Sequence, residues 1–268
     1  MVPGKRHNTI MKADMMINPT TFYFIVYSWI AVALVMFPLV LWVVVPYGRH
    51  TSTHWGPLIN NKLGWVLMES PALFFFAYFF LFGSNHHTFV PWIFFSLWMI
   101  HYINRTLIFP FRLRTKGKMM PVTIVVLAIC FNLVNAFING YYLGFLSGKY
   151  EINWLYDPRF IAGSILFFSG LIINWQSDNI LIHLRKPGET GYFIPKGGIF
   201  TYISCPNHFG EIIEWTGFAL MTWSLPALAF ATWTLVNLLP RALHHHRWYQ
   251  RTFPEYPINR KALIPFIL

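Results

Sequence analysis

The residues of this sequence that are most able to do chemistry are ionisable side chains inside long apolar runs. Only nine residues are acidic, and several of them lie in such runs or at their edges: Glu69, Asp178, Glu211 and Glu214. A charged side chain inside a bilayer is costly, so it usually faces the interior of a helix bundle or a water-filled cavity. These positions are therefore candidates for a functional site.

The spacing of the polar residues predicts that they form stripes along four helices. At 3.6 residues per turn, positions 3, 4, 7, 8 or 11 apart lie near one face of a helix. The stripes are Tyr102 with Arg105; Asn174 with Asp178 and Arg185; Asn207 with Glu211 and Glu214; and Arg241 with His245 and Tyr249. Four such stripes can converge on one polar cavity. A cavity lined by arginine, asparagine, aspartate and tyrosine suits a large polyanionic ligand.

The same stripes are also compatible with interhelical hydrogen bonding or with a transporter. A single intramembrane asparagine or aspartate often serves only as a hydrogen bond between helices, worth about 0.6 kcal/mol. A transporter could also use a polar cavity, although no pair of glycine- or proline-broken half-helices recurs in the two halves of the chain. The alignment of four stripes favours a ligand site.

A metal site at the histidine run is excluded by helix geometry, and the common nucleotide-binding motifs are absent from the sequence. The run His244-His245-His246 cannot hold one metal ion, because consecutive helical residues point about 100° apart. Neither G-x-G-x-x-G nor a P-loop occurs, so a nucleotide would not be held by a Rossmann fold. We expect no metal site.

The elements that position these residues are expected to be membrane-spanning helices. Apolar residues make up 56% of the 268 positions and charged residues 11%, whereas soluble domains carry about 25% charged residues. Apolar runs long enough to approach or reach the roughly 20 residues of a spanning helix recur along the whole chain, and we predict seven spans in one domain, 1–268: Thr20–Val45, Gly64–Phe82, Val90–Phe109, Pro121–Leu146, Phe160–Ile182, Phe209–Trp223 and Leu225–Leu243. Residues 1–19 form the predicted N-terminal tail.

The distribution of positive charge predicts the orientation of the chain in the membrane. The net charge is +11, but it is not arranged as a nucleic-acid-binding surface. The loops after the first, third and fifth spans share a side with the C-terminal segment, and that side holds fourteen of the twenty Lys and Arg residues. The positive-inside rule then predicts a cytoplasmic C terminus and an N terminus outside. The membrane is either a bacterial inner membrane or the endoplasmic reticulum.

The second half of the sequence resembles a known enzyme family. The resemblance is carried by an ordered series of segments in the region 120–268: Asn174–Asp178, Leu184–Glu189, Ile194–Tyr202, Asn207–Trp215, Arg241–Tyr249, Phe253–Pro257 and Arg260–Phe266. The series is similar to that of the steroid 5-alpha-reductases (3-oxo-5-alpha-steroid 4-dehydrogenases), and the likeness extends back to about Trp65. It implies an all-α, seven-helix membrane enzyme that reduces the 4,5 double bond of a 3-oxo-4-ene steroid with NADPH, without an obligate protein partner.

The resemblance also implies roles for particular residues. Glu69 and Tyr102 match the pair that the family places at the 3-keto oxygen of the substrate, with Trp65 and Met68 beside them. The residues that match the NADPH pocket of the family are Arg105, Asn174, Asp178, Arg185, Tyr192, Asn207, Glu211, Arg241, His245 and Tyr249. Hydride addition to an enone builds negative charge on the ketone oxygen, which Tyr102 and a protonated Glu69 could stabilise by donating hydrogen bonds.

The sequence departs from the family pattern next to the expected catalytic glutamate. Met68 stands where steroid-reducing members usually carry glutamine, and Phe193 stands where some members carry arginine. The preferred substrate is therefore left open. Reduction of a polyprenol or an enoyl-thioester lipid is an alternative activity. A membrane methyltransferase of the isoprenylcysteine type is another, and it would not need Glu69 with Tyr102.

Overall fold

The computed structural model describes residues 17–44, 51, 53–83, 88–114, 117–148, 150–185, 189 and 191–268. Most of the predicted N-terminal tail, residues 1–16, lies outside the described residues. The longer helices are α2 (Pro19–Trp42), α3 (Asn61–Phe82), α4 (Phe89–Ile103), α6 (Val122–Tyr141), α7 (Pro158–His183), α8 (Pro206–Thr222) and α9 (Leu225–Thr252). The fold class predicted from the sequence, an all-helical protein, is confirmed.

The shorter elements lie at the ends of these helices. They are two π-helical turns (Asn104–Ile108 and Tyr142–Leu146), helix α5 (Phe109–Arg112), three 3₁₀ turns (Thr53–Trp55, Ile152–Tyr156 and Gly198–Thr201) and strands β1 (Leu58–Asn60) and β2 (Met119–Pro121). The two strands pair antiparallel, with Leu58 opposite Pro121. They tie together the first residues of α3 and α6, which begin immediately after them.

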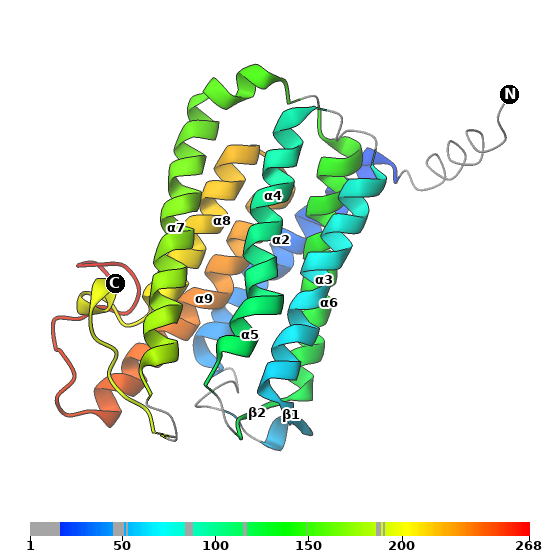
Figure 1. Ribbon diagram of the computed structural model, residues 1–268. Helices are drawn as coiled ribbons and strands as arrows, with labels where there is room; N and C mark the ends of the chain where they lie inside the picture. Colours follow the sequence, from blue (N-terminus) through cyan, green and yellow to red (C-terminus); the bar gives the residue numbers. More distant parts are fainter. Residues whose placement is uncertain are drawn as a thin grey trace, which may run out of the picture.

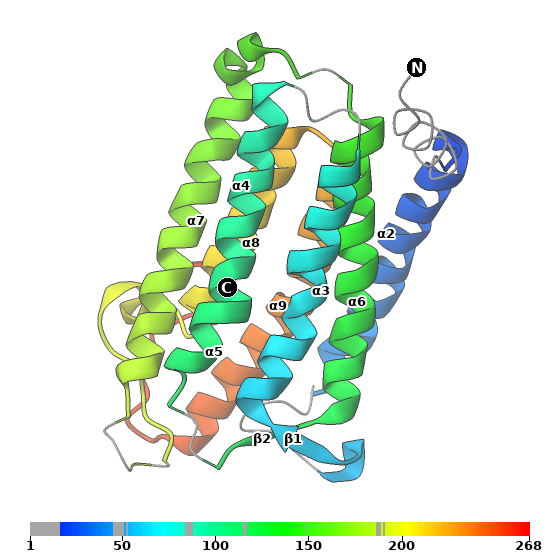
Figure 2. The ribbon, with the colours of Figure 1, turned by 45° about the vertical axis from the view of Figure 1, so that its right-hand side comes forward.

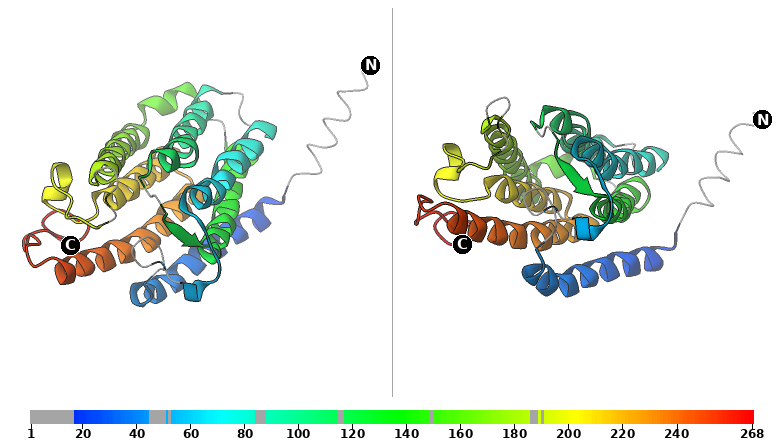
Figure 3. Two further views of the ribbon diagram at one scale, coloured as in Figure 1. Left: turned by 60° about the horizontal axis from the view of Figure 1, so that its bottom comes forward. Right: turned by 90° about the horizontal axis from the view of Figure 1, so that it is seen from below.

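The long helices lie side by side and successive helices run in opposite directions (Figures 1 and 2). The β1–β2 pair, the segment before α8 and the C-terminal segment all lie at one end of the bundle (Figure 1). In the views from below, α2 lies at the outside of the bundle and runs beside α9 (Figure 3). The two helices that the sequence separates only by Ser224 and its neighbours are distinct: α8 ends at Thr222 and α9 begins at Leu225.

Four helices in the described part of the chain are long and apolar enough to cross a membrane: α2, α3, α6 with its π-helical turn, and α7. Helices α4 and α8 have 15 and 17 residues, fewer than the roughly 20 that span a bilayer. However, α4 continues without interruption through a π-helical turn into α5. The number of seven spans and the orientation of the termini stay predictions.

The π-helical turn after α4 has a local cause in the sequence. Pro110 has no backbone N–H and its ring would clash with a carbonyl one turn back, so the α-helical pattern cannot continue through it. The chain widens by one residue, and the Phe109 N–H donates to the carbonyl of Asn104. Such π-bulges often occur at functional sites, and this one contains Arg105.

Glycines bring α7 and α8 into backbone contact. A Cβ atom at Gly163 would collide with the Gly217 carbonyl, and one at Gly170 would collide with the backbone of Gly210 and Glu214. The glycines occur seven residues apart on both helices, so they meet in pairs along the antiparallel interface. Small residues of this kind let transmembrane helices approach closely, where packing replaces the hydrophobic effect.

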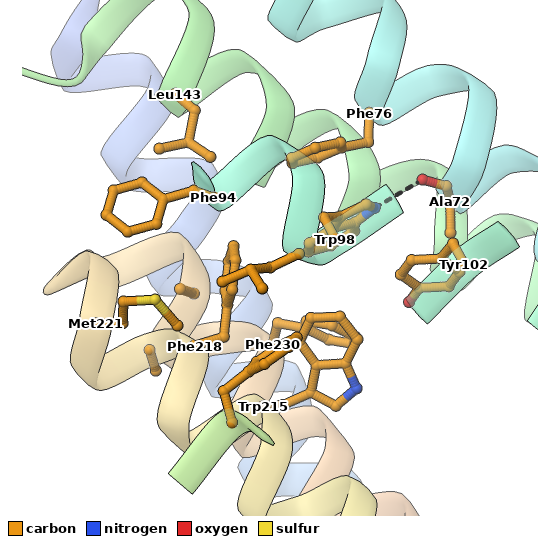
Figure 4. Close-up of a cluster of buried hydrophobic side chains, with 14 of the residues drawn as sticks. Ala72, Phe76, Phe94, Trp98, Tyr102, Leu143, Trp215, Phe218, Met221 and Phe230 are labelled. Atoms are coloured by element: carbon orange, nitrogen blue, oxygen red, sulfur yellow. Dashed lines mark hydrogen bonds between the residues drawn. The ribbon is translucent and has the colours of Figure 1, made fainter. Parts of the chain in front are cut away.

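An aromatic cluster fills the centre of the bundle (Figure 4). The Trp98 ring stacks on Phe76 at 4.3 Å, and its indole N–H donates to the Ala72 carbonyl at 2.9 Å. Trp98 also contacts Trp215 of α8 and Tyr102, one turn further along α4. The cluster therefore forms a rigid support under Tyr102.

Candidate active site

A cavity of about 550 Å³ opens inside the bundle, and its lining extends from Tyr102 and Phe230 of the aromatic cluster to Leu113 and Arg114, which follow α5. Side chains from α2, α3, α4, α6, α7, α8 and α9 line it. One part of its wall is apolar, with Met36 and Val40 of α2, Leu127 and Phe131 of α6, and Phe230 and Trp233 of α9. A polar part of the wall includes Arg105, Asp178 and Arg241, so the cavity can take ligands that have both apolar and charged groups.

Arg105 lies at the centre of the polar wall. Its guanidinium group is 3.2 Å from a carboxylate oxygen of Asp178 on α7 and 3.9 Å from one of Glu211 on α8. The same group lies over the Trp65 ring at 4.7 Å and over the Phe109 ring at 4.8 Å. Two carboxylates and two aromatic faces thus hold one cation in a fixed position at the cavity.

Asn174 supports this network from behind rather than lining the cavity. It is only 1% exposed, and its amide donates to the Asn207 carbonyl at 3.0 Å and to Glu211 at 3.5 Å. The helix stripe that the sequence predicts on α7 thus splits: Asp178 lines the cavity, whereas Asn174 contacts the first turn of α8. The structure places Asn174 outside the cavity wall because α8 approaches α7 so closely beside Gly170 and Gly210.

Glu69 and Tyr102 both line the cavity. Glu69 comes from α3 and Tyr102 from the last turn of α4. The Asn132 amide of α6 lies 3.4 Å from the Glu69 carboxyl and 2.6 Å from the Met68 carbonyl oxygen. Trp65 and Met68, on the same face of α3, also line the cavity and are nearly buried.

A cluster of cations and tyrosines lines the end of the cavity near the α7–α8 connection. Arg185 follows the end of α7, lies over the Tyr192 ring at 5.1 Å and donates to the Gly191 carbonyl at 2.6 Å. Arg114 donates to the Arg185 carbonyl at 3.0 Å. Neither arginine has a carboxylate partner among the residues that the structure describes. Their charge is therefore left to attract an anion.

Helix α9 presents three residues of its polar stripe to this end of the cavity. Arg241, His245 and Tyr249 all line it, as their spacing of four residues places them on one helix face. Tyr249 is nearly buried and stacks on Tyr256 of the C-terminal segment at 5.2 Å. The C-terminal segment therefore supports the cavity from outside.

Of the site residues selected from the sequence, Asn174 and Glu214 do not line this cavity, and the others do: Trp65, Met68, Glu69, Tyr102, Arg105, Asp178, Arg185, Tyr192, Asn207, Glu211, Arg241, His245 and Tyr249. No group of three possible metal ligands occurs among the described residues. The three histidines at 244–246 diverge: His244 contacts the Leu41 carbonyl, His245 lines the cavity and His246 contacts Ser204.

The cavity also contains polar residues that the sequence analysis did not select, namely Arg114, Asn132, His208, Thr234 and Asn237. Asn132 could have been found, since Asn132, Asn135 and Asn139 form a buried polar series within an apolar helix. Beneath the cavity, His101 and Glu214 form a buried pair at 2.7 Å, with side chains 2% and 0% exposed. Nothing in the separate stripes indicated that these two residues would meet.

Comparison with known proteins agrees with this arrangement. Residues 118–268 match the family model of 3-oxo-5-alpha-steroid 4-dehydrogenase. The chain is 40% identical over 256 residues to steroid 5-alpha-reductase DET2 of Gossypium hirsutum, which covers 93% of this chain and 98% of that protein. It is 41% identical over 223 residues to 3-oxo-5-alpha-steroid 4-dehydrogenase 1 of Homo sapiens, covering 82% and 85%. With its apolar helices, the chain is an integral membrane protein and an oxidoreductase, and it belongs to the steroid 5-alpha-reductase (3-oxo-5-alpha-steroid 4-dehydrogenase) family.

Proposed function

We propose that this protein reduces the 4,5 double bond of 3-oxo-4-ene steroids to give 5-alpha-dihydrosteroids, with NADPH as the reductant. The observation that carries the proposal is that Glu69 and Tyr102 line the same cavity as a group of apolar side chains and several arginines. The family membership supports the reaction, since relatives carry the names of steroid 5-alpha-reductases.

The residues at the cationic end fit a dinucleotide with several phosphates. Arg114, Arg185 and Arg241 offer planar guanidinium donors, which suit phosphate oxygens better than lysine does. Tyr192 and Tyr249 offer hydroxyl donors and aromatic faces beside them. Asp178 and Glu211, held by Arg105, can accept from amide or ribose hydroxyl groups. When bound, NADPH supplies the hydride.

Glu69 and Tyr102 are proposed to act on the ketone of the steroid. Reduction of the double bond builds negative charge on the 3-keto oxygen, and a donor aimed at that oxygen stabilises the transition state by a few kcal/mol. The Tyr102 hydroxyl donates there, and Glu69 donates a second hydrogen bond or orients the tyrosine. The aromatic cluster under Tyr102 fixes the direction of its ring, so little reorganisation is needed.

The apolar wall is proposed to hold the fused rings of the steroid. Phe131, Phe230 and Trp233 supply broad rigid surfaces, and Met36 and Val40 close the cavity on the side of α2. Removal of apolar area from water contributes about 25 cal/mol per Å². The same surfaces exclude water from the ketone, which strengthens the hydrogen bonds there.

The proposed topology places seven crossings in the membrane, with the C terminus in the cytoplasm and the N terminus outside. The end of α5 and the end of α7, after which basic segments follow in the sequence, lie at the same end of the bundle as the C-terminal segment (Figure 1). The cationic end of the cavity lies at that same end, so a cytosolic dinucleotide would reach it without crossing the bilayer.

The test is NADPH oxidation by detergent-purified protein with progesterone or testosterone, with identification of the product. Glu69→Gln is measured beside the wild type, because glutamine keeps the size of the side chain but cannot act as an acid. Formation of the 5-alpha-dihydrosteroid, lost in Glu69→Gln, supports the proposal. Binding of NADPH without turnover of any 3-oxo-4-ene steroid would move the substrate to another unsaturated lipid, and folded protein that does not bind NADPH would overturn the proposal.

A further inference from the structure

Asn132 is a buried amide in the middle of the apolar helix α6. It is 4% exposed, lines the cavity and reaches across to α3, where it contacts the residue pair Met68 and Glu69. A polar side chain in this position is costly in a membrane unless its hydrogen bonds are made. Its partners therefore indicate what it does.

The Met68 carbonyl fixes which way the Asn132 amide points. A carbonyl oxygen can only accept, so the group that lies 2.6 Å from it must be the amide nitrogen, Nδ2. The same nitrogen lies 3.4 Å from Oε2 of Glu69. Because Nδ2 donates, Oε2 acts as an acceptor. In a protonated carboxyl group the carbonyl oxygen is the stronger acceptor, so this contact favours the proton on Oε1.

We propose that Asn132 is a positioning residue for Glu69, which fixes the rotamer of its carboxyl group and selects Oε1 as the oxygen that carries a proton. This inference rests on the proposed function, in which Glu69 acts at the steroid ketone. When Oε2 of Glu69 accepts from Asn132, the protonated Oε1 is held in one orientation and can donate a hydrogen bond in that direction. Asn132 thus prepares Glu69 before the substrate binds.

The contact between α3 and α6 does not depend on Asn132. Glycines already bring these two helices together, since a Cβ atom at Gly140 or Gly144 would collide with the backbone of Phe76 or Phe79. The β1–β2 pair joins their first residues at the other end. Asn132 is therefore not needed to hold α3 against α6. Its contact with Glu69 is the role that remains for this buried amide.

The test compares Asn132→Leu with Asn139→Leu, two replacements of a buried asparagine on the same helix. Asn139 is 2% exposed, and its amide donates to the Asn135 carbonyl within α6. It does not line the cavity. In steroid reduction with NADPH, Asn132→Leu is expected to lower kcat about tenfold or more with an unchanged KM for NADPH. Asn139→Leu is expected to keep kcat near the wild-type value.

Infrared spectroscopy of the C=O stretching vibration of the Glu69 carboxyl group supplies a readout that does not need turnover. The difference is taken between the spectra of the wild type and each variant. The band of the Glu69 carboxyl group is assigned by its loss in Glu69→Gln. It is expected to shift in Asn132→Leu and to stay in place in Asn139→Leu. An unshifted band, or equal losses of kcat in both asparagine variants, overturns the inference. If the wild type reduces no steroid but the band shifts as expected, the positioning of Glu69 holds and the proposed function fails.

Discussion

Arg105 combines two ion pairs and two aromatic contacts at the wall of the cavity. Lysine would keep its charge but could neither pair with two carboxylates through a planar fork nor stack on Trp65 and Phe109 in the same way. We therefore expect Arg105→Lys to raise the Kd for NADPH by about tenfold. The measurement is an NADPH titration followed by fluorescence.

Arg159 provides the matched control for this substitution. It also pairs with a carboxylate, at 2.8 Å from Asp157, and lies over two tryptophan rings, but at the opposite end of the bundle. Arg159→Lys should leave the Kd for NADPH unchanged. If wild type and Arg105→Lys bind NADPH with equal Kd, Arg105 does not contribute to NADPH binding.

The pair of His101 and Glu214 predicts a cost in stability rather than a direct effect on binding. Both side chains are buried, and Oε2 of Glu214 makes no hydrogen bond in the described structure. Removal of one partner leaves the other as a buried polar group without its hydrogen bond, which costs about 1–3 kcal/mol. Glu214→Ala should lower the Tm in detergent, whereas Ala at the exposed Glu255 should not. A Tm of Glu214→Ala equal to that of the wild type would contradict the prediction.

At the scale of the elements, the interface of α7 with α8 depends on glycine. A methyl group at Gly170 would meet the backbone of Gly210 and Glu214, which cannot move aside as a flexible side chain would. The helices must separate, so Gly170→Ala should destabilise the protein by about 1–3 kcal/mol. Gly148→Ala is the control, because a Cβ atom there meets nothing within 4 Å. Thermal unfolding of both variants checks this, and similar Tm values would show that the interface yields.

The beginning of α7 predicts a dependence of stability on pH. Asp157 accepts from the Arg159 side chain and backbone N–H, and these hydrogen bonds lower its pKa from 3.8 to about 2. A lowered pKa in the folded state gives stabilisation that is complete above pH 3.8 and is lost as the pH falls through about 2. Asp157→Asn keeps a capping oxygen but does not titrate. The loss of Tm as the pH is lowered from above 3.8 to about 2 should therefore be smaller in Asp157→Asn, and an equal loss would contradict this.

The sequence predicted the elements well where one apolar run coincided with one helix. It predicted α3, α6 and α7 to within a few residues, because apolar length and capping residues act locally. It did not predict the π-helical turn at Arg105, since that turn arises where the α-helical hydrogen bonding of α4 meets Pro110, which cannot continue it. Nor did it predict that Asn174 lies behind the cavity wall, because this depends on how closely two helices approach.

At the scale of the whole molecule, the spacing of polar residues along the sequence was enough to identify most of the polar wall of the cavity. The apolar wall could not be predicted in the same way. Phe131, Phe230 and Trp233 look like any other lipid-facing or core residue in a sequence that is 56% apolar. Polar residues are informative in a membrane because each is costly, whereas apolar residues carry little information about which surface they face.

The topology makes a prediction for the chain as a whole. The seven crossings proposed above would place the two termini on opposite sides of the membrane, with the C terminus on the side rich in arginine and lysine. Reporters fused to each terminus in separate proteins, one active only in the cytoplasm and one only outside, should report opposite locations. Termini on the same side would require an even number of crossings.

The glycine contacts between α7 and α8 also bear on how this sequence can change over time. Gly163, Gly170, Gly210 and Gly217 touch neither the apolar nor the polar wall of the cavity, yet each leaves no room for a side chain. A larger side chain at one of them would collide with backbone atoms of the facing helix, and no second mutation can make those backbone atoms smaller. These four positions should therefore accept as few substitutions during evolution as the residues of the cavity itself. In a library of variants, substitutions at them should reduce the amount of folded protein, although none of the four glycines contacts a ligand.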